Sequence, residues 1–128
     1  RGRIAASGVA PGASLVAVRV LDDRNRGYLA DWVAALDWLA AERPDVRVVN
    51  MSLVSQALFG ADCELACGGQ SGCATNRLFA NAIEALWARG AVLFAASGND
   101  GRADAVAAPA CVSRAVAVAA VDAGDALA

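Results

Sequence analysis

The sequence predicts an α/β domain of three layers, in which a parallel sheet is covered by helices on both faces. Short apolar, β-branched segments alternate with longer segments of helical periodicity along the 128 residues. The candidate strands are apolar almost throughout, which is typical of strands buried on both faces. The stretches between them are long enough for crossovers, and crossovers of that length make neighbouring strands parallel.

The first half of the chain contains two candidate strands around one candidate helix. Ser14–Leu21, SLVAVRVL, follows a Pro-Gly turn and is predicted to be a strand. Tyr28–Glu42 is predicted to be a helix, because its apolar residues recur at helical spacing and a proline follows its last turn. Val46–Leu53, VRVVNMSL, is the second predicted strand. The apolar positions of the helix are Trp32, Val33, Leu36, Leu39 and Ala40.

The second half begins with an irregular segment, Val54–Thr75, which carries three of the four cysteines. Asn76–Arg89 is predicted to be a second helix with one broad apolar face. Ala91–Ala96 and Ala115–Val121 are the third and fourth predicted strands. The apolar face of the second helix consists of Leu78, Phe79, Ala82, Ile83, Leu86 and Trp87.

Composition excludes several classes of function. Hydrophobic residues make up 58% of the chain, which argues against disorder. A net charge of −2 gives no reason to expect nucleic acid or an anionic membrane as a partner. No run of uncharged apolar residues is long enough to span a membrane, and no glycine-rich nucleotide motif follows a strand, so no cofactor is expected. The N-terminus has neither an initiator methionine nor the apolar core of a signal peptide, which indicates an internal piece of a longer protein.

The four cysteines, Cys63, Cys67, Cys73 and Cys111, allow three interpretations. A four-thiolate zinc site normally uses pairs of C-x2-C, and these are missing, so no metal is expected. Two disulfides that staple the long loop are favoured and indicate an oxidising compartment. Free cysteines are the third interpretation. If two disulfides form, four cysteines can pair in three ways, and the spacing does not choose among them.

The stretch AVLFAASGNDG places a polar side chain directly after a predicted strand. The strand ends at Ala96 and a tight turn carries Asn99 past it. Such a turn is ordinary chemistry for Gly and Asn. In open parallel sheets, however, the carboxyl ends of strands are also where substrates bind, so Asn99 is a candidate hydrogen-bond donor.

Two other segments also allow two interpretations each. Asn50–Leu53 ends the second strand, either as a plain strand terminus or as a substrate-binding edge. Arg26–Tyr28 is a plain loop or a segment that pairs with a peptide.

Four segments, taken together and in order, resemble the subtilisin-like serine proteases, the subtilases. They are GVAPGASLVAVRVL at the start, VVNMSL at Val48–Leu53, AASGNDG at Ala95–Gly101 and VSRAVAVAAVD at Val112–Asp122. The resemblance implies a subtilisin-like domain that is incomplete over residues 1–128, with Val54–Thr75 as a cysteine-containing insert.

The resemblance also implies roles for individual residues. Asn99 is similar to the asparagine of the oxyanion hole, which binds the negative oxygen of the tetrahedral intermediate. Residues similar to those that flank an extended peptide substrate are Asn25, Arg26, Gly27, Ser52, Leu53 and Val54. Residues similar to one wall of the S1 pocket are Ala96, Ser97 and Gly98. Val54 stands where the family commonly has glycine, which is expected to narrow the pocket.

The chain departs from the family pattern at the catalytic triad. It contains no histidine, so no Ser-His-Asp triad can form within it. The resemblance places the aspartate and the histidine before this chain and the serine after it. The expected function is therefore that of a secreted, bacterial serine endopeptidase acting on peptides or proteins, with these residues inactive without the remainder of the catalytic domain. The alternative is a subtilase-like module that binds peptides or serves a structural role without catalysis.

Overall fold

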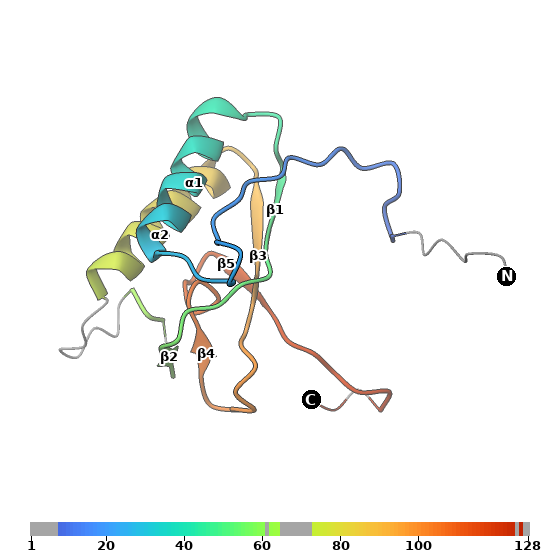
Figure 1. Cartoon of the computed structure of the whole chain (residues 1–128), viewed down its shortest axis with the longest axis vertical. Coiled ribbons are helices and arrows are strands. Elements are labelled where there is room, and N and C mark those ends of the chain that lie inside the picture. The colour runs from blue at the N-terminus through green and yellow to red at the C-terminus, as the bar shows by residue number, and fades with distance from the viewer. Residues whose placement is uncertain (1–7, 61, 65–72, 125, 127–128) are drawn as a thin grey trace, which may run out of the picture.

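A three-stranded parallel sheet lies at the centre of the computed structural model, which describes residues 8–60, 62–64, 73–124 and 126 (Figure 1). Its strands are β1 (Val48–Met51), β3 (Val92–Ala96) and β5 (Ala115–Val118), in the order β1-β3-β5. Met51 pairs with Ala95, and Ala96 pairs with Val118. All three strands therefore end at the same edge of the sheet. The predicted α/β class with a parallel sheet is confirmed.

Two helices, α1 (Leu29–Glu42) and α2 (Cys73–Ala88), cover the same face of this sheet (Figure 1). The apolar stripe predicted for the first helix is confirmed, because its main positions are buried against α2 and the sheet. Neither of these helices is long and apolar enough to cross a membrane. The buried core between the layers includes Trp32, Val33, Leu36, Leu39, Val49, Met51, Phe79, Ala82, Ile83, Leu86, Leu93 and Ala95.

The opposite face of the sheet carries apolar side chains that no described helix covers. Side chains alternate between the two faces of a strand, so every second residue points away from the helices. On that outer face Val48 is 63% exposed, Val116 41% and Val118 50%. The described residues therefore form two of the three predicted layers, the sheet and the helices on one of its faces. The fold is incomplete because no described helix covers the other face.

The prediction of a strand at Ser14–Leu21 is wrong. The segment joins no sheet in the structure, and Leu15 is 92% exposed. Its residues have the β-branched character of a strand, but a strand also needs a neighbour that completes its ladder of hydrogen bonds. Among the described strands, β1 has only β3 beside it. The last strand is also shorter than predicted, since it ends at Val118 instead of Val121.

The apolar face of α2 is narrower than its sequence suggests. Phe79, Ile83 and Leu86 are buried, as predicted, whereas Leu78 is 52% exposed and Trp87 47% exposed. The Trp87 ring instead lies under the guanidinium of Arg114, 4.2 Å from its Cζ, in a cation–π contact. The helix also begins at Cys73, earlier than the predicted start at Asn76.

A second, antiparallel sheet that the sequence did not predict joins β2 (Leu58–Phe59) to β4 (Val106–Ala107). Each strand has two residues, too few to show an alternating pattern. The small sheet ties the cysteine-containing insert to the loop between β3 and β5.

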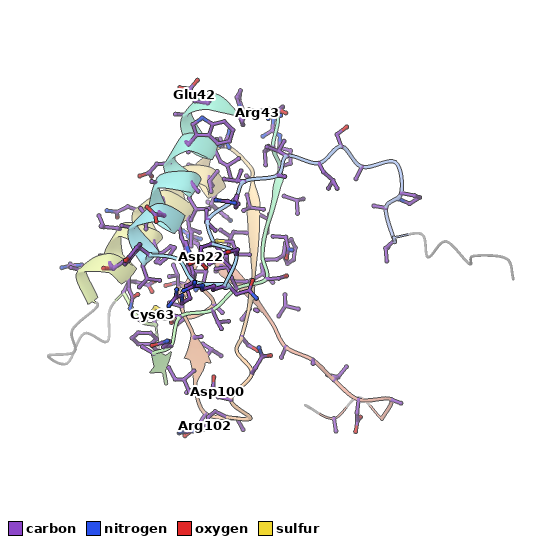
Figure 2. All side chains as sticks on the ribbon, in the orientation of Figure 1. Asp22, Glu42, Arg43, Cys63, Asp100 and Arg102 are labelled. Atoms are coloured by element: carbon purple, nitrogen blue, oxygen red, sulfur yellow. A yellow bond between two sulfur atoms is a disulfide. The ribbon has the colours of Figure 1, made fainter. Side chains whose placement is uncertain are left out.

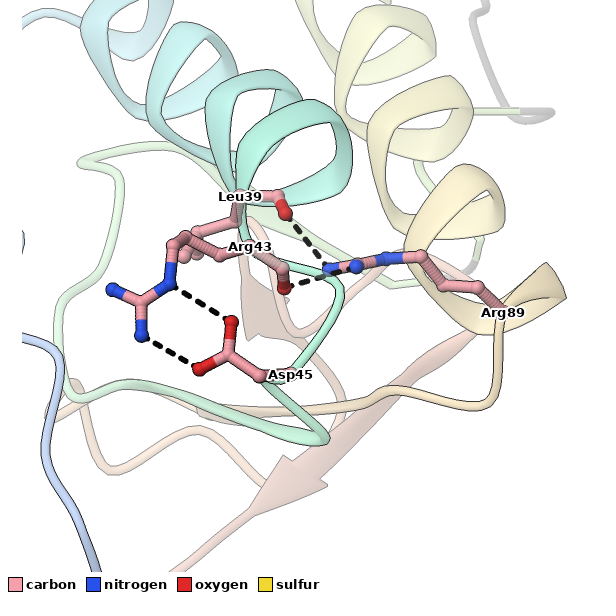
Figure 3. A network of polar contacts seen from close by, with 4 residues as sticks. All are labelled: Leu39, Arg43, Asp45 and Arg89. Atoms are coloured by element: carbon pink, nitrogen blue, oxygen red, sulfur yellow. Dashed lines mark hydrogen bonds and ion pairs between the residues drawn. The ribbon is translucent and has the colours of Figure 1, made fainter.

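Arg89 joins the ends of the two helices (Figure 3). Its guanidinium donates hydrogen bonds to the carbonyl oxygens of Leu39, at 2.9 Å, and of Arg43, at 3.0 Å. Each carbonyl also accepts one backbone N–H, that of Arg43 on Leu39 at 3.2 Å and that of Val46 on Arg43 at 3.1 Å. Arg89 therefore adds a charged second donor to two acceptors at the end of α1. Arg43 itself points the other way and forms a bidentate ion pair with Asp45, at 2.9 and 2.6 Å. This pair lowers the pKa of Asp45 to about 2.

Arg89→Ala is expected to destabilise the fold by about 1.5–3 kcal/mol, because two half-buried carbonyls lose a charged donor. Arg43→Ala is a matched control, since it removes an arginine from the same corner but keeps its backbone carbonyl. We expect a smaller loss for the control, because exposed ion pairs contribute little to stability. Urea unfolding of both variants measures the difference. Equal losses for the two variants would contradict the proposed role of Arg89.

Candidate active site

Two of the predicted substrate-binding segments meet at the carboxyl edge of the parallel sheet. Ser52–Val54 leaves β1, and Ala96–Gly98 includes the last residue of β3, the strand beside it, and the start of the turn that carries Asn99. Because Met51 and Ala95 are paired, the two segments start side by side. Asp100 and Arg102 lie at this end of the molecule, and Glu42 and Arg43 lie at the opposite end (Figure 2). This edge is the position in which parallel α/β sheets bind ligands.

Asn99 is an exposed polar residue of the turn after β3, as is Asp100 beside it. It follows Gly98, whose φ of +129° is in the region that favours glycine. Within the part of the chain that the structure describes, the Asn99 side chain makes no hydrogen bond. Its amide group is therefore available to an external acceptor.

The backbone of this turn is held from two sides. The N–H of Ser97 donates to the carbonyl of Val118 in β5, at 3.0 Å. The carbonyl of Ser97 accepts from the N–H of Ala107 in β4, at 2.8 Å. Both bonds attach the turn to strands, and a candidate donor needs that support to keep a fixed position.

The segment after β1 is fixed by a residue that sequence reasoning missed. Ser55 donates its backbone N–H to the carbonyl of Ala108, at 2.9 Å, and its Oγ accepts from the N–H of Ala108, at 3.0 Å. The same Oγ donates to the carbonyl of Ala57, at 2.9 Å. Leu53 and Val54 just before it are half-buried, and Ser52 is exposed. A single serine in a loop gives no sequence signal for such a role.

The third predicted segment, Asn25–Gly27, forms a separate tight turn before α1. The carboxylate of Asp22 accepts the N–H groups of Arg24 and Arg26, at 2.9 and 2.8 Å, and Asn25 has a φ of +56°. In the described residues no hydrogen bond joins this turn to the other two segments. A Cβ on Gly27 would lie 2.3 Å from the carbonyl oxygen of Val20, so only glycine fits there.

The structure pairs Cys63 with Cys111 in a disulfide, with a Cα–Cα distance of 5.4 Å. The N–H of Cys63 also donates to the carbonyl of Cys111, at 3.1 Å. The bond attaches the insert to the loop that leads into β5. Of the other two cysteines, Cys67 lies outside the described residues and Cys73 is the first residue of α2.

Two carboxylates in the loops that follow β2 and β3, those of Glu64 and Asp104, have polar partners. Arg102 and Asp104 form a bidentate ion pair, at 2.8 and 2.9 Å, which lowers the pKa of Asp104. Glu64 accepts hydrogen bonds from the N–H and the hydroxyl of Ser113. Burial raises the pKa of the Glu64 carboxyl, but these hydrogen bonds outweigh it and hold the pKa below its ordinary value. The described residues contain no cluster of three metal-binding side chains.

Comparison with known proteins gives a consistent result. A profile of the subtilase family matches residues 2–128. The minor extracellular protease Epr of Bacillus subtilis is 33% identical over 115 residues, which cover 90% of this chain and 15% of Epr. The extracellular serine proteinase of a Thermus species is 34% identical over 118 residues, 92% of this chain and 24% of that protein. Thermitase of Thermoactinomyces vulgaris is 34% identical over 120 residues, 93% of this chain and 36% of thermitase. The chain therefore spans a minor part of the length of each of these relatives.

Proposed function

The chain belongs to the subtilase family, and from this premise we propose that residues 1–128 are the central part of the catalytic domain of a secreted serine endopeptidase. The reaction is hydrolysis of a peptide bond in peptides or proteins. A serine, a histidine and an aspartate from other parts of the whole protein form the triad. This chain supplies the oxyanion donor and the walls of the substrate groove.

One observation supports the proposal: Asn99 follows the carboxyl end of the central strand β3, next to the end of β1 from which Ser52–Val54 leaves, and its amide has no hydrogen-bond partner among the described residues. When the serine Oγ attacks the scissile carbonyl, the histidine takes its proton and the carbonyl oxygen becomes negative. The Asn99 amide donates a hydrogen bond to that oxygen. The bond stabilises the transition state more than the bound substrate, since the charge is absent before attack.

The other predicted segments hold the substrate in an extended form. Such binding uses main-chain hydrogen bonds to exposed backbone groups, with side-chain pockets providing specificity. Ser52–Val54 and Asn25–Gly27 are the proposed flanking segments, and Ala96–Gly98 is the proposed wall of the S1 pocket. The Cys63–Cys111 disulfide supports secretion, because such bonds persist in oxidising compartments. The names of the relatives Epr and the Thermus proteinase, both extracellular, support it too.

The proposal is tested by comparing the whole protein with the 128-residue chain. We expect the whole protein to hydrolyse a casein-derived peptide and to lose this activity after treatment with a serine-directed phosphonylating reagent. We expect the chain alone to be inactive, since it lacks histidine. A whole protein that binds the peptide but never cleaves it would instead establish the non-catalytic alternative.

A further inference from the structure

The small sheet of β2 and β4 has two faces with different surroundings. Leu58 pairs with Ala107, and Phe59 pairs with Val106. Paired residues of antiparallel strands point to the same side, and successive residues point to opposite sides. Phe59 and Val106 pack against the main core. Leu58 and Ala107 therefore face away from it.

The side chains on that second face lie against the turn that precedes Asn99. A Cβ placed on Gly98 would lie 3.9 Å from the Cβ of Ala107 and 3.9 Å from a terminal methyl carbon of Leu58. The carboxylate oxygen Oδ2 of Asp100 would lie closer still, at 3.5 Å. All three are ordinary van der Waals distances, so a single methyl group on this side of Gly98 would already contact its neighbours. Ala107 has no exposed surface, although it is not part of the main core. The insert thus contributes an apolar side chain to the neighbourhood of the proposed S1 wall.

The position of Leu58 is fixed by the contacts around it. The N–H of Ala107 is bonded to the carbonyl of Ser97, at 2.8 Å, which keeps β4 against the turn. The Oγ of Ser55 holds the N–H of Ala108 just after β4, at 3.0 Å, and the carbonyl of Ala57 just before β2, at 2.9 Å. These bonds hold the backbone on both sides of the β2–β4 pair, and thus the Cα of Leu58, near the turn.

We propose that Leu58 is a specificity-determining residue that restricts the substrate side chain held against Gly98 to small ones, such as those of Gly, Ala and Ser. The inference rests on the proposed function, which places Ala96–Gly98 in the S1 pocket. In this proposal Leu58 and Ala107, which lie next to Gly98, limit the depth of the S1 pocket and so exclude a large side chain at the residue before the scissile bond. A difference of one methylene in such a pocket changes kcat/KM by about tenfold or more.

The test uses the whole protein and three peptides that differ only in the residue before the scissile bond, Ala, Leu or Phe. The wild-type protein is expected to prefer the Ala peptide. Leu58→Ala is expected to raise kcat/KM for the Leu and Phe peptides, relative to the Ala peptide, by about tenfold or more. Leu58→Met is the matched control, because it keeps the side-chain volume and is expected to keep the wild-type preference. Thermal unfolding curves of both variants verify that they are folded.

Calorimetric binding of product peptides that end in Ala or Phe provides a readout that needs no catalysis. If no peptide is cleaved but Leu58→Ala still improves binding of the Phe-terminated product, the proposed function fails and the role of Leu58 stands. If peptides are cleaved and the size preference is the same in wild type and Leu58→Ala, the role of Leu58 is refuted and the proposed function stands. A wild-type protein that cleaves the Phe peptide as well as the Ala peptide also refutes it.

Discussion

Asn99→Ala in the whole protein is expected to lower kcat by about 10²–10³-fold and to change KM much less. The magnitude is the one known for the asparagine of a subtilisin, a member of the same family. The effect is expected on kcat and not on KM, because the acceptor oxygen is a neutral carbonyl in the bound substrate and carries negative charge in the transition state. Steady-state kinetics on a single chromogenic peptide measures both parameters.

Two variants separate loss of the donor from damage to the turn. Asn99→Asp has nearly the same shape but no N–H donor, and its charge repels the oxyanion, so its kcat is expected to fall at least as far as that of Asn99→Ala. Asp100→Asn changes the neighbouring residue and is expected to leave kcat within a few-fold of wild type. An Asn99→Ala variant that raises KM at constant kcat would show that Asn99 binds the ground state. Full activity would mean that it is only a turn residue.

The helices and the central strands could be predicted from the sequence because their patterns are local. Residues at helical spacing mark α1, and a short apolar run bounded by turn residues marks β3. Ser14–Leu21 has the composition of a strand but not the structure, because pairing is a property of two segments and the described residues provide no partner for it. The apolar face predicted for α2 was confirmed at Phe79, Ala82, Ile83 and Leu86 but not at Leu78 and Trp87, since which side chains become buried depends on what packs against them.

The candidate site was predictable only in part. Asn99 and Ser52–Val54 could be placed at one sheet edge, because parallel strands end together. The hydrogen bond between Ser55 and Ala108 and the position of Leu58 near Gly98 could not be predicted, because each joins residues that lie far apart in the sequence. The cysteine spacing left three pairings open, and only the fold brings Cys63 next to Cys111.

Removal of the Cys63–Cys111 disulfide is expected to lower the free energy of unfolding by about 4 kcal/mol. The two cysteines are 48 residues apart, and a crosslink over a loop of that length removes much conformational freedom from the unfolded chain. Both side chains are buried, at 1% and 5% exposure, so alanine is the appropriate replacement. Urea unfolding of the Cys63→Ala, Cys111→Ala double variant of the whole protein, compared with wild type, measures the loss.

The single variants distinguish the crosslink from ordinary packing. Each one already breaks the bond, so Cys63→Ala, Cys111→Ala and the double variant are expected to lose nearly the same stability. Ser113→Ala is a matched control, since it weakens a hydrogen bond to Glu64 that joins the same two segments without a covalent link. Its loss is expected to be about 1–3 kcal/mol, because the partner is a carboxylate. If the double variant lost the sum of the stabilities lost by the two single cysteine variants, the stabilising role of the disulfide would be contradicted. Reaction of these two cysteines in a thiol titration of the denatured, unreduced protein would show that the disulfide is not formed.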